Sequence, residues 1–326
     1  MAQAKFILKK VARGISLLFG LSILTFFMMH NSPVDPIEAY LGGNTSITRE
    51  QRLALEEHWG LNDPPQIQYL NWLKNFVSGD MGYSKIHRRP VVNIIKEKFV
   101  SSIILMGISW VLSGTIGFIL GIYSAVKRGK FADKFIKWIS YIQVSVPTFW
   151  LGLMLLIVFS VWLRWFPIGI SVPIGMSKEN VTIWNRIHHM ILPIVTLSIL
   201  GIANVTLHTR EKMIDVLNSE YVLFAKARGE SNWEIIKNHG LRNVCLPAIT
   251  LHFAYFSELF GGSVLAEQVF SYPGLGSTLT EAGLKSDLPL LMGIVMISAV
   301  FVFSGNMLAD IINAFINPRL KENLNE

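Results

Sequence analysis

The sequence predicts an all-α polytopic membrane protein with six transmembrane helices, and three observations support this. Apolar side chains make up 51% of the 326 residues and charged ones only 16%, whereas about a quarter of a typical globular chain is charged. The mean hydropathy is +0.44. Several uncharged stretches have the roughly 20 residues that a helix needs to cross a bilayer core. This composition excludes a disordered chain and argues against a soluble enzyme, and the single cysteine, Cys245, excludes a disulfide scaffold.

Six stretches meet the length requirement for a membrane span. The first follows a basic leader, and we interpret residues 1–30 as a leader and retained anchor because no small-residue cleavage site follows its long apolar core. The fifth contains Glu258 near its middle. Strands are excluded, because open sheet edges are not satisfied in lipid and these runs do not alternate with a period of two. The predicted spans are residues 14–29, 99–126, 138–163, 190–207, 243–266 and 288–309.

The positions of Lys and Arg predict that both termini are cytoplasmic. In that orientation the cytoplasmic segments hold seventeen Lys and Arg, and the short external loops hold four. The net charge of +7 is explained by this topology, so we expect no nucleic-acid partner.

Residues 31–98 are predicted to form an extracytoplasmic segment. Helical spacing over 51–59 and 66–77 brackets a turn at Asn62-Asp63-Pro64-Pro65. Because a segment of this length has little hydrophobic core of its own, we expect it to form a small cap on the membrane surface, with its aromatic side chains at the interface.

The cytoplasmic loop 208–242 carries the most information. A helix over 219–226 is predicted to stop at Arg228-Gly229, and the capping box Ser231-Asn232-Trp233-Glu234 predicts a second short helix that Gly240 ends. The small Ala225 and Ala227 beside Gly229 would let another protein approach closely. An amphipathic loop lying on anionic lipid is an equally good interpretation of these residues alone.

The motifs in this loop and elsewhere resemble those of ABC-importer permeases of the dipeptide, oligopeptide and nickel branch. The resemblance covers nearly the whole chain in order, although any one motif is weak. The sequence differs from the family pattern at two positions. Glu230 stands where the family usually has an apolar residue, and Gly240 stands where it usually has alanine. The matching stretches include Gly60-Leu61-Asn62-Asp63-Pro64, Gly79-Asp80-Met81-Gly82, Ala225-Lys226-Ala227-Arg228-Gly229, His239-Gly240-Leu241-Arg242-Asn243, Gly261-Gly262-Ser263-Val264, Pro273-Gly274-Leu275-Gly276 and Asn317-Pro318-Arg319.

The resemblance implies a translocation subunit in the cell membrane of a prokaryote. Its permease core would be residues 99–317, followed by a cytoplasmic tail, 318–326. It would pair with a second, related permease, sit in membrane lipid, and receive substrate from an extracytoplasmic solute-binding protein. ABC ATPase subunits would hold ATP and Mg, so this chain would bind no cofactor itself. The residues expected to couple to the ATPase are Ala225, Ala227, Arg228, Gly229 and Glu230.

The catalytic motifs of enzymes are missing from the sequence. There is no GxxxxGK[ST] phosphate loop, no HExxH and no paired-cysteine metal spacing, so we expect no enzymatic activity. An ion-coupled secondary transporter is an alternative from another class, but no convincing internal repeat is present. A channel is a further alternative, but nothing resembles a selectivity-filter loop.

Three residues are candidates for the translocation path: Glu258, His252 and His208. An intramembrane carboxylate is costly, so Glu258 either binds a cation or substrate amine, or has a structural partner on a neighbouring helix. Six helical positions separate His252 from Glu258 by about 9 Å and place them on different faces unless the helix is broken. The metal ligands stay unknown. We expect the substrate to be nickel, as a small chelate, with di- or oligopeptides as the alternative.

Overall fold

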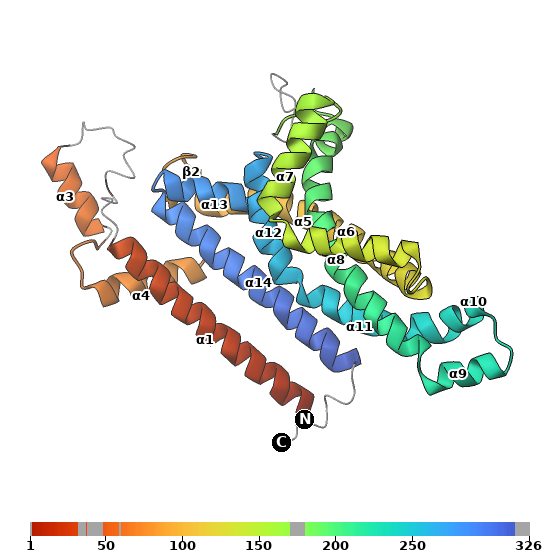
Figure 1. The fold of residues 1–326 in the computed structure, drawn as a ribbon. Coiled ribbons are helices and arrows are strands. Elements are labelled where there is room, and N and C mark those ends of the chain that lie inside the picture. The colour runs from red at the N-terminus through yellow and green to blue at the C-terminus, as the bar shows by residue number, and fades with distance from the viewer. Residues whose placement is uncertain (1, 32–36, 38–47, 59, 170–179, 317–326) are drawn as a thin grey trace. The chain divides into compact units, whose positions relative to one another are not determined.

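The computed structural model describes residues 2–31, 37, 48–58, 60–169 and 180–316. In this part of the chain the regular structure is helical apart from one hairpin whose two strands have two residues each, which confirms the predicted all-α class (Figure 1). The predicted family ending at Asn317-Pro318-Arg319 and the tail 318–326 lie outside the described residues. The chain divides into two compact units, one of Met1–Ser101 with Gly274–Ser304 and one of Ser102–Pro273 with Gly305–Glu326.

Four helices of the described chain are long and apolar enough to cross a membrane unbroken. These are α1 (Ala2–His30), α5 (Val91–Val126), α8 (Ile183–Leu217) and α14 (Leu288–Ile316). Two bent helix pairs also qualify, which gives up to six spans, as predicted. Some helix ends differ from the predicted span ends. α5 starts eight residues before its predicted span, and α8 includes the first ten residues of the predicted loop 208–242.

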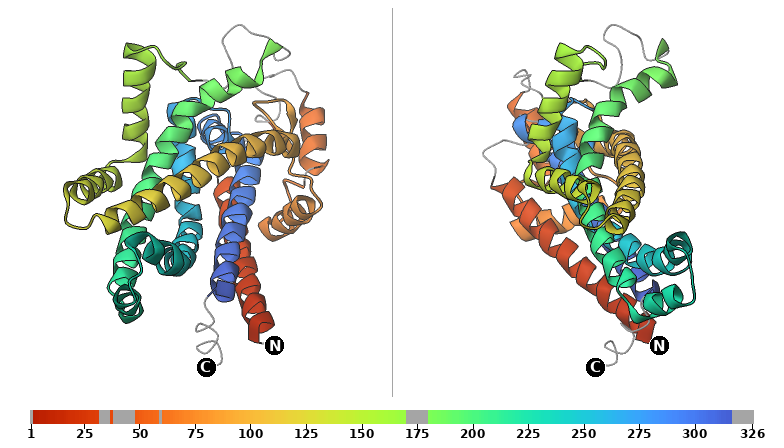
Figure 2. Two further views of the ribbon diagram at one scale, coloured as in Figure 1. Left: turned by 90° about the vertical axis from the view of Figure 1, so that its right-hand side faces the viewer. Right: turned by 45° about the vertical axis from the view of Figure 1, so that its right-hand side comes forward.

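Both bent pairs correct a predicted continuous span. The predicted span 138–163 is broken between α6 (Phe131–Ser145) and α7 (Thr148–Leu156), with a bend of 105° (Figure 2). Pro147 explains this break, since its ring disfavours helical backbone at Val146, which is extended with φ −93° and ψ 126°. A short π-helix, η1 (Ile157–Trp162), continues α7.

The predicted span 243–266 is broken as well. α11 (Leu241–Ala254) and α12 (Phe256–Val269) belong to the second bent pair, in which the helix axis turns by 49°. The break is at Tyr255, whose ψ of 2° leaves the helical region.

In the first unit, Tyr69 and Trp72 of the 31–98 segment pack on the first span. The helices α3 (Arg49–His58) and α4 (Pro65–Val77) confirm the two predicted there. From α4, the Tyr69 hydroxyl is 2.8 Å from Ser22 Oγ of α1, and its ring meets the buried Phe26 edge-on with 5.4 Å between ring centroids. Part of the aromatic face expected at the membrane surface is therefore covered by α1.

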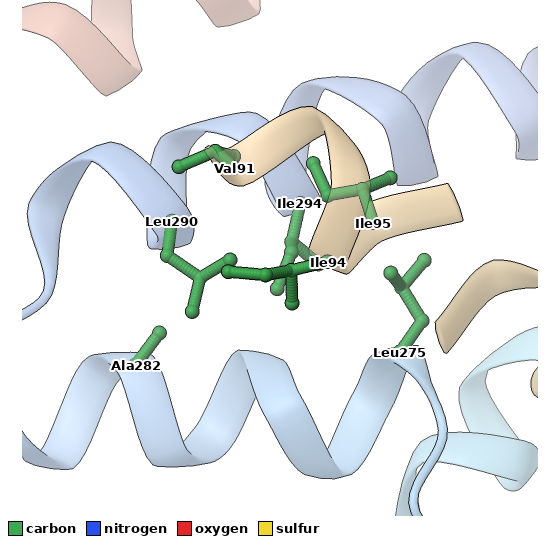
Figure 3. Packing of buried hydrophobic residues seen from close by; sticks show 7 residues of the cluster. All are labelled: Val91, Ile94, Ile95, Leu275, Ala282, Leu290 and Ile294. Carbon is green, nitrogen blue, oxygen red and sulfur yellow. The ribbon is translucent and has the colours of Figure 1, made fainter. Parts of the chain in front are cut away.

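A compact apolar core holds the rest of the first unit together. Side chains from the start of α5, from α13 (Leu275–Leu284) and from α14 interdigitate there (Figure 3). Beside it lies the hairpin of β1 (Tyr83–Ser84) and β2 (Arg89–Pro90). Asp287, which is fully buried, accepts hydrogen bonds from Ser84 Oγ at 2.6 Å and from the Ile86 N–H at 3.0 Å, and so fixes the hairpin to the turn before α14. The core residues are Val91, Ile94, Ile95, Leu275, Ala282, Leu290 and Ile294.

In the second unit, α8 contacts α6, α7, α11 and α12. The second half of α5 also packs closely on α8, because a Cβ at Gly117 would lie 2.7 Å from Val205 Cβ and one at Gly121 would lie 2.8 Å from the Thr206 carbonyl oxygen. The GxxxG spacing of Gly117 and Gly121 is thus used for helix packing. α8 runs through Pro193 without a break.

Candidate functional site

The chain between α8 and α11 folds as a pair of short helices, α9 (Glu220–Ala227) and α10 (Asn232–Ile235). At the end of α9 the Gly229 N–H donates to the Lys226 carbonyl at 3.0 Å and the Glu230 N–H to the Ala225 carbonyl at 3.1 Å, the pattern of a Schellman motif. Gly229 has φ +88°, so the predicted stop depends on a left-handed residue. The capping box at Ser231 and Glu234 is confirmed, with the Glu234 N–H donating to Ser231 Oγ at 3.3 Å.

Gly240 does not end the second helix, contrary to expectation. The π-helix η3 (Ile236–Gly240) continues from α10 directly into α11. Gly240 is buried against α8, where an added Cβ would lie 3.1 Å from Met213 Sδ. Gly240 thus leaves room for the Met213 side chain between η3 and α8, and it does not act as a helix stop.

The loop exposes a different set of side chains from the one expected. Ala225 is only 1% exposed and packs with Val222 and Ile235 in a small core between α9 and α10, so it is not available to another protein. Ala227, Arg228 and Gly229 are exposed. The sequence interpretation missed the large apolar side chains on this surface. The buried Val222 and Ala225 are three residues apart and share one face of α9, so their immediate neighbours lie off that face, and this pattern could have indicated the exposed side chains. They are Tyr221, Leu223, Phe224 and Trp233.

Glu230 ties the tip of the loop to η3. Its carboxylate pairs with Arg228, and its Oε2 lies 3.1 Å from His239 Nε2. The Arg228 guanidinium, and next the His239 ring, hold the pKa of Glu230 below its usual value, so this carboxylate stays ionised near neutral pH. The departure from the family pattern at Glu230 therefore creates an ion pair within the loop.

The second unit also contains a cavity of about 280 Å³, lined by residues of α5, α8 and both helix breaks. Glu258 and His252 both line it, although they are six positions apart. The break at Tyr255 lets both side chains reach the same cavity. A broken helix is the condition that the sequence analysis set for these two residues to share a site. His208, within α8, is absent from the lining.

His252 is held in place by Trp110 of α5. The two rings stack with 4.4 Å between centroids, His252 Nε2 donates to the Trp110 carbonyl at 2.9 Å, and Trp110 Nε1 donates to the His252 carbonyl at 3.3 Å. Since a carbonyl only accepts, Nε2 carries the proton and Nδ1 is an acceptor. Nδ1 is buried and has no hydrogen-bond partner among the described residues.

The described residues do not assemble a metal centre. No three His, Cys, Asp or Glu side chains in this part of the chain lie close enough together to hold a metal ion. His252 and Glu258 alone would leave most of a metal's coordination sites unfilled.

Comparison with known protein families identifies the chain. Residues 117–322 match the family described as "Binding-protein-dependent transport system inner membrane component", and residues 3–106 match the N-terminal part of such components. The chain belongs to this family of ABC-importer permeases. The permease is therefore a multi-pass membrane subunit of an ABC importer and not an enzyme, and the importer's ATPase and binding protein are separate components.

Three curated relatives align with the permease over nearly their whole lengths. The oligopeptide transport system permease protein AppB of Bacillus subtilis is 37% identical over 98% of this chain and 100% of the relative. A putative peptide permease of Brucella ovis is 33% identical over 97% of this chain and 99% of the relative. The di/tripeptide transport system permease protein DppB of Pseudomonas aeruginosa is 30% identical over 97% of this chain and 98% of the relative.

A buried polar site joins α6 to α8, and the sequence interpretation missed it. Asp133 of α6 is 1% exposed and accepts two hydrogen bonds from Arg210 of α8, at 2.6 Å from Nε and 2.9 Å from Nη2. Ser124 Oγ donates to it at 2.7 Å and the Gly129 N–H at 2.8 Å. Asp133 stands in a run of lysines and arginines, and a lone acid in such a run is a signal that could have revealed this ion pair.

Proposed function

We propose that this permease forms half of the translocation path of an ABC importer for di- or oligopeptides. The observation that carries the proposal is the 37% identity with an oligopeptide permease over 98% of this chain and the whole of the relative. The further similarity to a di/tripeptide permease supports the same substrate class. Nickel, the substrate first expected from the sequence, gains no support from these relatives or from a metal centre in the described residues.

In this proposal the pair of helices α9 and α10 docks on an ATPase subunit at the cytoplasmic face. Leu223, Phe224 and Trp233 are exposed on these two helices, and a protein surface can bury such large apolar side chains. Arg228 and Gly229 lie exposed in the turn that joins α9 to α10. ATP-driven movement of the ATPases would push this surface and rock the helices of the path between two access states. A second, homologous permease would supply the other half of the path.

The proposal is tested by uptake into cells that lack the gene. Radioactive trialanine and radioactive nickel are supplied separately to the parent strain, the deletion strain and the deletion strain carrying the gene on a plasmid. We expect trialanine uptake to fall on deletion and return with the plasmid, to depend on ATP, and to be unaffected by excess nickel. Unchanged peptide uptake combined with lost nickel uptake would overturn the proposal.

A further inference from the structure

We propose that the cavity of about 280 Å³ in the second unit binds the ammonium end of a translocating peptide, and that Glu258 is the carboxylate that receives it. This inference rests on the proposed function, because it takes the substrate to be a peptide. It adds a binding site, its chemistry and the residue that determines specificity.

Both helix breaks of the second unit open onto this one cavity. Val146 and Pro147 from the break between α6 and α7 line it, as does Tyr255 from the break between α11 and α12. At membrane depth, irregular backbone is stable only where it is buried in protein or lines a water-filled cavity. Discontinuous helices also form the substrate sites of many transporters, because their free ends present unpaired backbone groups to the ligand. The coincidence of two breaks indicates a ligand site rather than a packing defect.

Glu258 has no structural partner in the part of the chain that the structure describes. No hydrogen bond or ion pair joins its carboxylate to any of these residues, whereas the adjacent Ser257 donates to Asn306 Oδ1 at 2.6 Å. The structural role that the sequence left open for Glu258 therefore has no support here. Glu258 is exposed in this chain and lines the cavity. A carboxylate within a membrane span is costly unless something compensates its charge, and a cationic ligand would do so.

The remaining polar lining favours a hydrogen-bond donor. His252 is 9% exposed, and its Nδ1 is a buried acceptor without a partner among the described residues. Asn204 and Thr148 add polar side chains to the lining. Among the described residues that line the cavity there is no Lys or Arg, so the lining offers no cationic side chain to the carboxylate end of a peptide.

The size of the cavity limits what it can hold. Pockets that enclose a whole drug-sized ligand measure roughly 300–1,000 Å³, and this cavity lies just below that range. It is large enough to hold one end of a peptide. An ammonium group at that end comes either from the amino terminus or from a lysine side chain, and the experiment separates these two sources.

The test measures charge and occupancy in the cavity by cysteine labelling of the assembled transporter in lipid nanodiscs. Cys245 lines a neighbouring cavity that shares His252, so Cys245→Ser provides the background. The probe is Gly262→Cys, because Gly262 lines the cavity and an added Cβ there makes only ordinary contact, 3.5 Å from Leu197 Cδ2. The matched control is Gly261→Cys, one position along α12, which is not in the lining and has nothing within 4 Å.

Labelling rates are compared for a cationic and an anionic methanethiosulfonate reagent of similar size, with and without Glu258→Gln. At Gly262→Cys we expect a preference for the cationic reagent that falls about tenfold with Glu258→Gln. At Gly261→Cys the preference should not change. An unchanged preference at Gly262→Cys, or a site that neither reagent reaches, would overturn the inference.

Ligand protection completes the test. Trialanine should slow labelling at Gly262→Cys, N-acetyl-trialanine should not, and Glu258→Gln should abolish the protection. Protection by an N-acetylated peptide that contains lysine would extend the site to side-chain ammonium groups. Protection by N-acetyl-trialanine, or by nickel alone, would overturn the inference.

The two proposals fail in different ways. If deletion of the gene leaves peptide uptake unchanged, the proposed function fails. If peptide uptake depends on the gene but Glu258→Gln does not change the reagent preference at Gly262→Cys, only this inference fails.

Discussion

Gly229 ends α9 in a backbone conformation that a side chain makes costly. Its φ is +88°, and the left-handed region costs an L-residue roughly 1–2 kcal/mol. No atom lies within 4 Å of the position of a Cβ, so the cost comes from the backbone and not from a clash. Gly229 is exposed on the surface proposed to meet the ATPase. A substitution there would therefore both strain the backbone of this surface and add a side chain to it.

We predict that Gly229→Asp leaves the protein folded and inserted in the membrane but abolishes transport. The substitution strains the Schellman turn and adds a negative charge next to Glu230. Peptide uptake and the amount of membrane-bound protein are measured together. Gly79→Asp is the matched control, because Gly79 has φ +91°, also has nothing within 4 Å, and lies in the 31–98 segment. Normal uptake by Gly229→Asp at normal expression would contradict the proposed docking surface.

Among the helices, α6 and α8 are joined by the buried pair of Asp133 and Arg210. Their side chains are 1% and 13% exposed, and Ser124 and Gly129 satisfy the remaining capacity of the carboxylate. Removing one partner of such a pair leaves a buried charge without compensation, at a cost of about 3–5 kcal/mol. The pair also fixes the turn before α6, because the Gly129 N–H is one of its donors.

We therefore predict that Asp133→Ala destabilises the protein by about 3–5 kcal/mol, measured by thermal unfolding in detergent. Asp215→Ala is the control, since the pair of Lys212 and Asp215 on the same helix as Arg210 is exposed and contributes about 0–1 kcal/mol. The double substitution Asp133→Leu with Arg210→Met should recover much of the loss, because it leaves no unpaired charge. Equal unfolding temperatures for Asp133→Ala and Asp215→Ala would refute this account.

At the scale of the whole molecule, the number of spans could be predicted from the sequence, but their continuity could not. Uncharged runs of sufficient length identify a span wherever it occurs. Pro147 gives a local reason for one break, whereas no proline or glycine stands at Tyr255 to indicate the other. For that reason the sequence placed Glu258 and His252 on different faces of one helix, and only the bend shows that they share a cavity.

The loop illustrates the same limit at finer detail. Its helices and caps could be predicted because Gly229 and the capping box are local signals. The burial of Ala225 depends on which face of α9 meets α10, and Val222 three positions earlier lies on that same face. The packing of Gly240 against Met213 joins segments far apart in the chain, so spacing alone could not reveal it.

The orientation in the membrane is predicted from the distribution of Lys and Arg. A fluorescent protein fused to the C-terminus should be bright, and alkaline phosphatase at the same point should be inactive, because both report a cytoplasmic location. Alkaline phosphatase inserted between Ser78 and Gly79 should be active, since the 31–98 segment is expected outside. The reverse pattern would invert the topology and place α9 and α10 on the wrong side for an ATPase.

Because α8 is unbroken, it joins the cavity rigidly to the loop of α9 and α10. Its residues Leu197, Gly201 and Asn204 line the cavity, and its last residue, Leu217, packs against the small core of the loop. The sixteen helical steps from Gly201 to Leu217 span about 24 Å at 1.5 Å per step. A tilt of about 5° around the cavity end would therefore move the loop end by about 2 Å, and a small displacement of the loop would in turn tilt α8 at the cavity wall. Force applied at the loop thus reaches the proposed peptide site through a single helix.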